Sequence, residues 1–222
     1  MRKLFFSVIA IPLLVVDGLF LWSAPGIVTR FYSWNELFSV MGGGIAYGVT
    51  HGIIRKPERL YLWGHEVTHL VVAKLFFKTV HGFHITSRDG GRVIIDGTNI
   101  WIDLAPYIFP SYNLLLLATA SIFRPAPPWG TAAYLVGTGF LFTMHLAFSL
   151  EGFLQGQPDL NRSGRFFSFA LVVLFLIGTV PILFAPGVGG AGRQVANLYA
   201  CWGNAAYETG RILFLAARAF HF

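Results

Sequence analysis

The sequence is poor in cysteine and in charge. Its single cysteine, Cys201, excludes an internal disulfide and any metal site built from several thiolates. Charged residues make up only 12% of the 222 residues, about half the share found in soluble globular domains. No basic cluster with interleaved aromatic residues offers a face for nucleic acid. We therefore expect neither a soluble domain nor a nucleic-acid partner.

Apolar residues fill the sequence instead, at 55% of the chain, and they come in long blocks. A predominantly apolar block of about 20 residues can span a bilayer as a helix. The chain is therefore predicted to be an all-α, multi-pass integral membrane protein with the lipid bilayer as a partner. Its 16 basic and 10 acidic residues give a net charge of +6, which is typical of Lys and Arg that flank spans at lipid headgroups.

We predict about six transmembrane helices. Each predicted span is apolar and is bounded by polar or proline-containing residues, and the six cover residues 4–22, 36–54, 60–77, 104–123, 131–154 and 166–185. The first span follows a basic start, but no A-x-A site follows it, so we expect it to remain uncleaved. Residues 1–192 are predicted to form one membrane-embedded domain, and residues 193–222 a C-terminal amphipathic or interfacial helix.

A short insert with a different character separates the third and fourth spans. Residues 81–97 contain two β-prone runs around Arg88-Asp89-Gly90-Gly91-Arg92. Asp-Gly between such runs is a strong signal for a tight hairpin turn. The sequence therefore predicts a small β-hairpin insert after the third helix.

The third predicted span contains His65-Glu66-Val67-Thr68-His69, an H-E-x-x-H motif. Composition alone would produce this pattern about 0.005 times in such a chain. On a helix, His65 and His69 share one face and could present two imidazoles to one zinc ion. Glu66 would lie beside the open coordination position as a candidate catalytic base. The alternative is a pair of helix histidines that only bind neighbouring groups.

A catalytic zinc site needs a third protein ligand. The downstream candidates are Asp103, His145, Glu151 and Asp159. Asp159 is favoured because it follows Pro158 in a helix break, where a carboxylate can turn freely, and because Gln155, Gln157 and Asn161 lie close to it in sequence. Glu151, on the preceding span, is the alternative ligand.

With these residues the chain resembles the site-2 protease family of intramembrane zinc metalloproteases. The resemblance covers about Gly64 to Gly164 and rests on the H-E-x-x-H motif, the β-prone insert, a span entered through Ala105-Pro106, and Asp159, which follows His69 by 90 residues. The chain departs from the family pattern at Thr68 and Leu160, where the family often has glycine. The resemblance therefore indicates a divergent branch.

The resemblance implies a zinc metalloendopeptidase with Zn²⁺ held by His65, His69 and Asp159, and with Glu66 as the base. Its substrates would be membrane proteins or peptides, cleaved in or near transmembrane segments. Asn161, His145 and Asn113 are candidates for binding substrate or the oxyanion. Two alternatives stay open: a non-catalytic membrane subunit with partners in a larger complex, and a membrane-embedded zincin that uses Glu151 and cleaves soluble or lipidated peptides.

Overall fold

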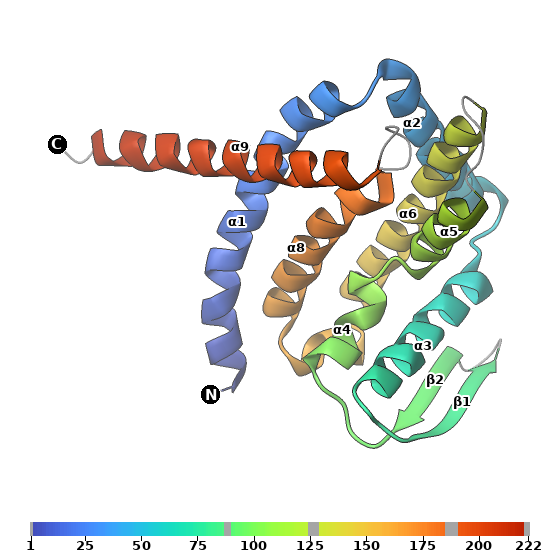
Figure 1. The fold of residues 1–222 in the computed structure, drawn as a ribbon. Helices are drawn as coiled ribbons and strands as arrows, with labels where there is room; N and C mark the ends of the chain where they lie inside the picture. Colours follow the sequence, from blue (N-terminus) through green and yellow to red (C-terminus); the bar gives the residue numbers. More distant parts are fainter. Residues whose placement is uncertain (1, 87–89, 124–128, 185–190, 220–222) are drawn as a thin grey trace.

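The computed structural model describes residues 2–86, 90–123, 129–184 and 191–219 as a set of long helices with one small sheet (Figure 1). The elements in chain order are α1 (Arg2–Phe31), α2 (Trp34–Val49), a π-helical turn η1 (Thr50–Ile54), α3 (Glu58–Leu75), β1 (Val80–Thr86), β2 (Gly90–Ile95), α4 (Ile100–Ile108), α5 (Ser111–Phe123), α6 (Trp129–Gln155), α7 (Pro158–Arg162), α8 (Arg165–Phe184) and α9 (Ala191–Ala219). The predicted helical architecture with a hairpin insert is confirmed at this level.

Four helices in the described ranges are long and apolar enough to cross a membrane. They cover Leu4–Gly26, Trp34–Ile54, Gly130–Gln155 and Arg165–Phe184. The pair α4 and α5 could form a fifth span, but the two helices meet at a 65° bend. The bend falls at Pro110, whose ring cannot continue a helix and which lacks a backbone N–H.

The prediction of about six spans is too high. Residues 60–77 do not qualify as a span within the described chain. The helix that forms there, α3, is 18 residues long and carries Glu58, Arg59, Glu66 and Lys74. Four charged side chains in 18 residues oppose burial in hydrocarbon, because each is costly to take from water.

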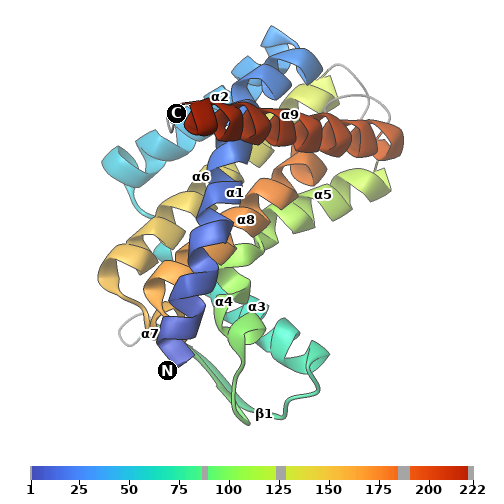
Figure 2. The same cartoon turned by 90° about the vertical axis from the view of Figure 1, so that its left-hand side faces the viewer.

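Helix α4 lies at the centre of the structure, and every residue from Ile102 to Ile108 is buried. It contacts α3 on one side and α7 and α8 on another. Around this centre α2 packs along α6, and α1 packs beside α8. The two views in Figures 1 and 2 show the hairpin at one end of the molecule, close to α3. The centre thus brings the motif helix and the short α7 together.

The hairpin is antiparallel, with pairs running from Val80 opposite Ile95 to Thr86 opposite Gly90. Residues 87–89, which belong to the predicted turn, lie outside the described residues. Along β2, half-buried residues alternate with exposed ones. Because successive strand residues point to opposite faces, Gly91 and Val93 share the half-buried face, and β2 contacts α3.

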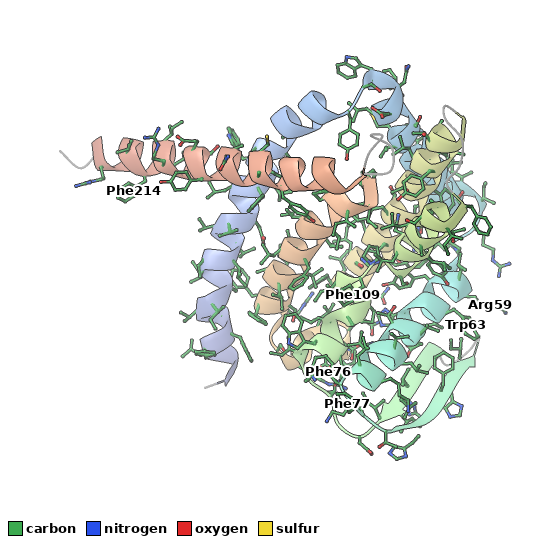
Figure 3. The ribbon with its side chains drawn as sticks, in the orientation of Figure 1. Arg59, Trp63, Phe76, Phe77, Phe109 and Phe214 are labelled. Atoms are coloured by element: carbon green, nitrogen blue, oxygen red, sulfur yellow. The ribbon has the colours of Figure 1, made fainter. Side chains whose placement is uncertain are left out.

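Helix α9 crosses α1 at a steep angle and extends past it (Figures 1 and 2). The Trp202 indole donates a hydrogen bond of 2.8 Å to the Phe20 carbonyl and anchors α9 on α1. Farther along, Ile212, Leu213 and Phe214 are exposed, and Figure 3 shows Phe214 on the projecting part. Helix α9 ends at Ala219, and the place of the C-terminal segment at a membrane interface stays a prediction.

The α2–α6 contact makes a sharp prediction at two adjacent glycines. A Cβ at Gly43 would lie 2.8 Å from the Phe140 backbone nitrogen, whereas a Cβ at Gly42 meets nothing within 4 Å. We expect Gly43→Ala to destabilise the protein by about 1–3 kcal/mol, the usual effect of overpacking. Gly42→Ala should be neutral or stabilising by about 0.5–1 kcal/mol, because alanine favours helix over glycine. Thermal unfolding in detergent measures both, and equal melting temperatures would contradict the close packing.

Candidate metal centre

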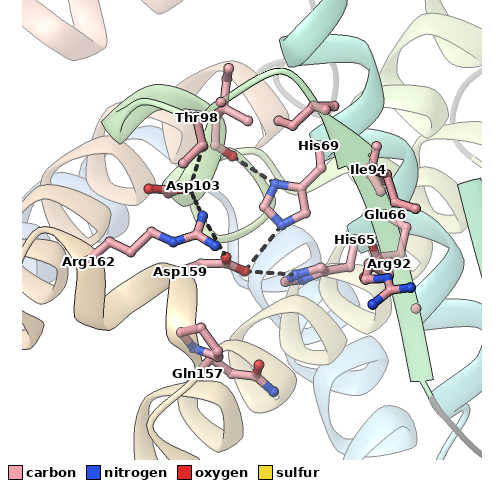
Figure 4. Close-up of a pocket in the computed structure, with 16 residues that line it drawn as sticks. His65, Glu66, His69, Arg92, Ile94, Thr98, Asp103, Gln157, Asp159 and Arg162 are labelled. Atoms are coloured by element: carbon pink, nitrogen blue, oxygen red, sulfur yellow. Dashed lines mark hydrogen bonds and ion pairs between the residues drawn. The ribbon is translucent and has the colours of Figure 1, made fainter. Parts of the chain in front are cut away.

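The two motif histidines face one aspartate from a different helix (Figure 4). On α3 the rings of His65 and His69 lie 4.9 Å apart, as expected for positions i and i+4 on one face. The Oδ2 atom of Asp159 on α7 lies 3.3 Å from His69 Nε2 and 4.0 Å from His65 Nε2. All three ligand atoms fall within 4.8 Å of one another. The structure therefore brings together the three residues that the sequence singled out.

A short, well-anchored helix carries Asp159. The chain turns at Gly156, which has φ +71°, a conformation that glycine adopts without strain. Pro158 then begins α7 at a position where its missing N–H is not needed. The carbonyl of the fully buried Leu160 accepts a hydrogen bond of 2.9 Å from Ser168. These contacts hold α7 against α8 and direct Asp159 toward α3.

His69 is oriented by a backbone carbonyl. Its Nδ1 lies 2.8 Å from the carbonyl oxygen of Ile102 in α4. In a regular helix that oxygen would accept the N–H of residue 106, but residue 106 is proline and has none. Since a carbonyl can only accept, Nδ1 carries a proton, and Nε2 is the nitrogen that faces Asp159.

Arg162 links two carboxylates at this centre. Its Nη1 lies 2.6 Å from Oδ1 of the buried Asp103 and 3.7 Å from Oδ1 of Asp159. Asp103 also accepts a hydrogen bond of 2.6 Å from the Thr98 hydroxyl. Burial raises the pKa of the Asp159 carboxyl, but the two imidazoles beside it lower that pKa by more. The net pKa lies well below the ordinary value, so Asp159 is a carboxylate at neutral pH.

Two cavities meet at Glu66. The larger, of about 660 Å³, is lined by the three candidate ligands and by β2, and the smaller, of about 420 Å³, extends toward Glu58 and Glu151. Both are lined by His65, Glu66, Gly91 and Gln157, so together they form a groove past the candidate centre. The carboxylate of Glu66 lies close to the backbone of Val93 in β2. A Cβ at Gly91 would lie 2.7 Å from Glu66 Cδ, so the strand passes directly over this side chain.

The donor set suits a zinc ion. Two imidazole nitrogens and one carboxylate oxygen are a common protein ligand set for catalytic zinc. His69 Nε2 and an Asp159 carboxylate oxygen face each other at 3.3 Å, and a proton or a cation must lie between them, because two lone pairs at that distance would repel. Ile102 supplies the carbonyl behind His69 that usually accompanies a metal-bound imidazole.

The three predicted oxyanion or substrate residues do not line the large cavity. Asn161 donates a hydrogen bond of 2.6 Å to the Gly156 carbonyl and closes the turn before α7. His145 is buried, with Nε2 2.9 Å from the Tyr107 carbonyl. Asn113 is buried and donates to the Thr138 carbonyl at 3.0 Å. In the described conformation each side chain bonds a neighbouring backbone carbonyl instead of facing the large cavity, and a role of these residues toward substrate stays a prediction.

Glu151, the alternative third ligand, lies outside the group formed by the two histidines and Asp159. Its Oε1 atom pairs with Lys56 and lies 3.1 Å from His51 Nε2. The carboxylate is therefore satisfied by the segment before α3, and the structure does not bring it to His65 and His69.

The structure also shows roles at the large cavity that the sequence did not predict. Arg162 could have been noticed from its i,i+3 spacing to Asp159 on a helix. Asp103 is a candidate ligand by sequence. Its pairing with Arg162 joins residues 59 apart in the chain, so no local sequence pattern predicts that pairing. The approach of Gly91 to Glu66 has no sequence signal beyond the glycine itself.

Metal binding distinguishes the two carboxylates. Asp159→Ala removes one of three converging ligands, so zinc affinity should fall at least about 100-fold, more than loss of an outer-shell partner usually causes. Glu151→Ala leaves all three ligands in place and should change the affinity less than about twofold, within the error of additivity for distant sites. Competition with a chromophoric chelator measures both, and the reverse order would exclude Asp159 as the ligand.

The chemistry of the site comes from a histidine pair on α3, Asp159 on α7 and Glu66 between the two cavities. Comparison of the chain with protein-family models, with curated proteins and with solved structures found no match.

Proposed function

We propose that the chain is a multi-pass integral membrane protein that hydrolyses peptide bonds as a zinc endopeptidase, with substrates cleaved in or near transmembrane segments. The observation that carries the proposal is the convergence of His65, His69 and Asp159 with Glu66 beside them in a groove. The likeness of residues 64–164 to site-2 proteases supports the same reaction. Four apolar helices long enough to span support a bilayer location.

In this proposal His65, His69 and Asp159 hold the metal. Zinc, when bound, would polarise the scissile carbonyl and acidify the attacking water. Glu66 is the base: its carboxylate accepts the water proton and returns that proton to the leaving amine. Its surroundings suit this role, since it is buried and lies close to the backbone of Val93.

The β2 strand offers a place for an extended substrate. In the described sheet β1 pairs with one side of β2, and residues 91–95 of β2 line the large cavity. A transmembrane helix hides its carbonyls in its own hydrogen bonds, so it must unwind before it can be cleaved. Added as a strand along β2, the unwound segment would exchange those bonds for bonds to the strand.

Arg162 would keep the Asp159 ligand aligned. Its guanidinium bonds Asp103 at 2.6 Å, and this buried anchor places it near the far oxygen of Asp159, leaving Oδ2 toward the histidines. Support of this kind from outside the ligand set typically raises metal affinity.

Loss of the base should abolish turnover without loss of metal. Glu66→Gln keeps the size of the side chain but cannot accept the proton, so cleavage should fall about 10²- to 10⁴-fold, the usual contribution of general base catalysis. Cleavage of a panel of single-span reporter peptides in proteoliposomes measures turnover, and elemental analysis of the same sample measures zinc. Wild-type rates from the Gln variant would contradict the assignment of Glu66.

The strand over Glu66 offers a second test. Gly91→Ala places a Cβ 2.7 Å from Glu66 Cδ and Oε1, so the carboxylate must move, and a displacement of about 1 Å at a catalytic group can reduce turnover about 100-fold. Gly82→Ala on β1 is the control, because its Cβ meets the end of the His84 side chain at 3.0 Å. Equal reporter cleavage by both variants would show that the approach of β2 to Glu66 does not matter.

A further inference from the structure

A small enclosed cavity lies beside His65, apart from the groove. Its volume is about 10 Å³, and it is lined by residues of α3, α4, α5 and α6, with Pro110 between α4 and α5. His65 lines this cavity and also both cavities of the groove. His65 therefore lies between the groove and the small cavity.

Three residues that line this cavity each have a buried polar atom without a hydrogen-bond partner among the described residues: His65 Nδ1, Tyr61 Oη and Asn113 Oδ1. The Asn113 amide is held in place because its Nδ2 donates to the Thr138 carbonyl at 3.0 Å. A buried polar atom without a partner costs about 1–3 kcal/mol. Three such atoms around one cavity indicate a shared partner.

The size and chemistry of the cavity fit one water molecule. A volume of about 10 Å³ is the lower limit for a single water, and a buried water typically makes about three hydrogen bonds. Water can accept from His65 Nδ1–H, donate to Asn113 Oδ1, and bond the Tyr61 hydroxyl in either direction. An apolar occupant would leave all three atoms unsatisfied.

We propose that this cavity binds a structural water that accepts the His65 Nδ1 proton, and that Asn113 and Tyr61 position His65 through it. The inference rests on the metal centre proposed above. The two ligand histidines are then held differently: His69 by the Ile102 carbonyl, and His65 by a water. With a metal bound, the Nε2 lone pair of each ring would be free to bind it beside Asp159.

The first readout is the Nδ1 resonance of His65 in the metal-free protein, measured by ¹⁵N NMR of histidine-labelled samples and assigned by its loss in His65→Gln. A water beside Nδ1 bonds that nitrogen whether or not it carries the proton, so Tyr61→Phe should shift the resonance, whereas Thr138→Val should leave it unchanged. An unchanged Nδ1 resonance in Tyr61→Phe would overturn the proposal. This measurement needs no metal, so it tests the water site even if the zinc proposal fails.

The second readout is zinc affinity in three variants. Asn113→Leu fills the space with apolar atoms and removes the acceptor, so affinity should fall about 10- to 100-fold, as for other outer-shell partners. Asn113→Ala leaves room for a second water, so its zinc affinity should fall less than that of Asn113→Leu. A residue that only fills space would show the opposite order, because alanine leaves the larger void. Tyr61→Phe removes one hydroxyl at nearly constant volume, so its zinc affinity should fall a few-fold.

Thr138→Val is the matched control. Thr138 is buried with an unpartnered hydroxyl, but it does not line the cavity, so affinity should equal that of the wild type. If Asn113→Leu fails to fold, the zinc affinity and the His65 Nδ1 resonance of Tyr61→Phe decide between the outcomes. Wild-type affinity in both Asn113→Leu and Tyr61→Phe would overturn the positioning role. A wild-type protein that binds no zinc would instead overturn the proposed function.

Discussion

Polar atoms enclosed by apolar helices need partners, and the candidate centre is arranged around that requirement. Each imidazole of α3 has one nitrogen toward Asp159 and another that must be satisfied elsewhere. For His69 the partner is the Ile102 carbonyl, which is available because Pro106 removes the N–H that would otherwise bond it. A proline inside α4 thus gives up one helical hydrogen bond and orients a side chain on another helix.

The carboxylates follow the same rule. Asp103 is buried deep in α4 and is satisfied by Thr98 and Arg162. Arg162 in turn extends toward Asp159, so one guanidinium serves two acids on two elements. Burial of charge is tolerated here because the charges are paired and hydrogen-bonded, since an unpaired buried charge would be strongly unfavourable. This pairing sets the position of α7 relative to α4, and α4 sets the position of α3.

Hydropathy predicted the apolar helices but miscounted the spans. The segment at 60–77 looks apolar, yet the helix begins at Glu58 and includes four charged side chains. The mean hydropathy of residues 104–123 is high enough for a span. Pro110, however, divides the segment into two helices whose axes differ in direction by 65°. The β-hairpin was predictable because its turn residues and β-prone runs are local signals. The position of α9 across α1 was not, since it depends on contacts such as Trp202 with Phe20.

By itself, the sequence determined the identity of the candidate ligands. A four-residue helical spacing puts two histidines on one face, and a proline break frees Asp159 from a regular helix. Only the tertiary structure decided which carboxylate reaches those histidines and what the remaining polar residues do. Asn161, His145 and Asn113 read alike in sequence, as polar groups near a motif, but each is committed to a backbone carbonyl. The reason is physical: a buried side chain bonds whichever group the packing brings within reach, and packing joins residues that no local pattern connects.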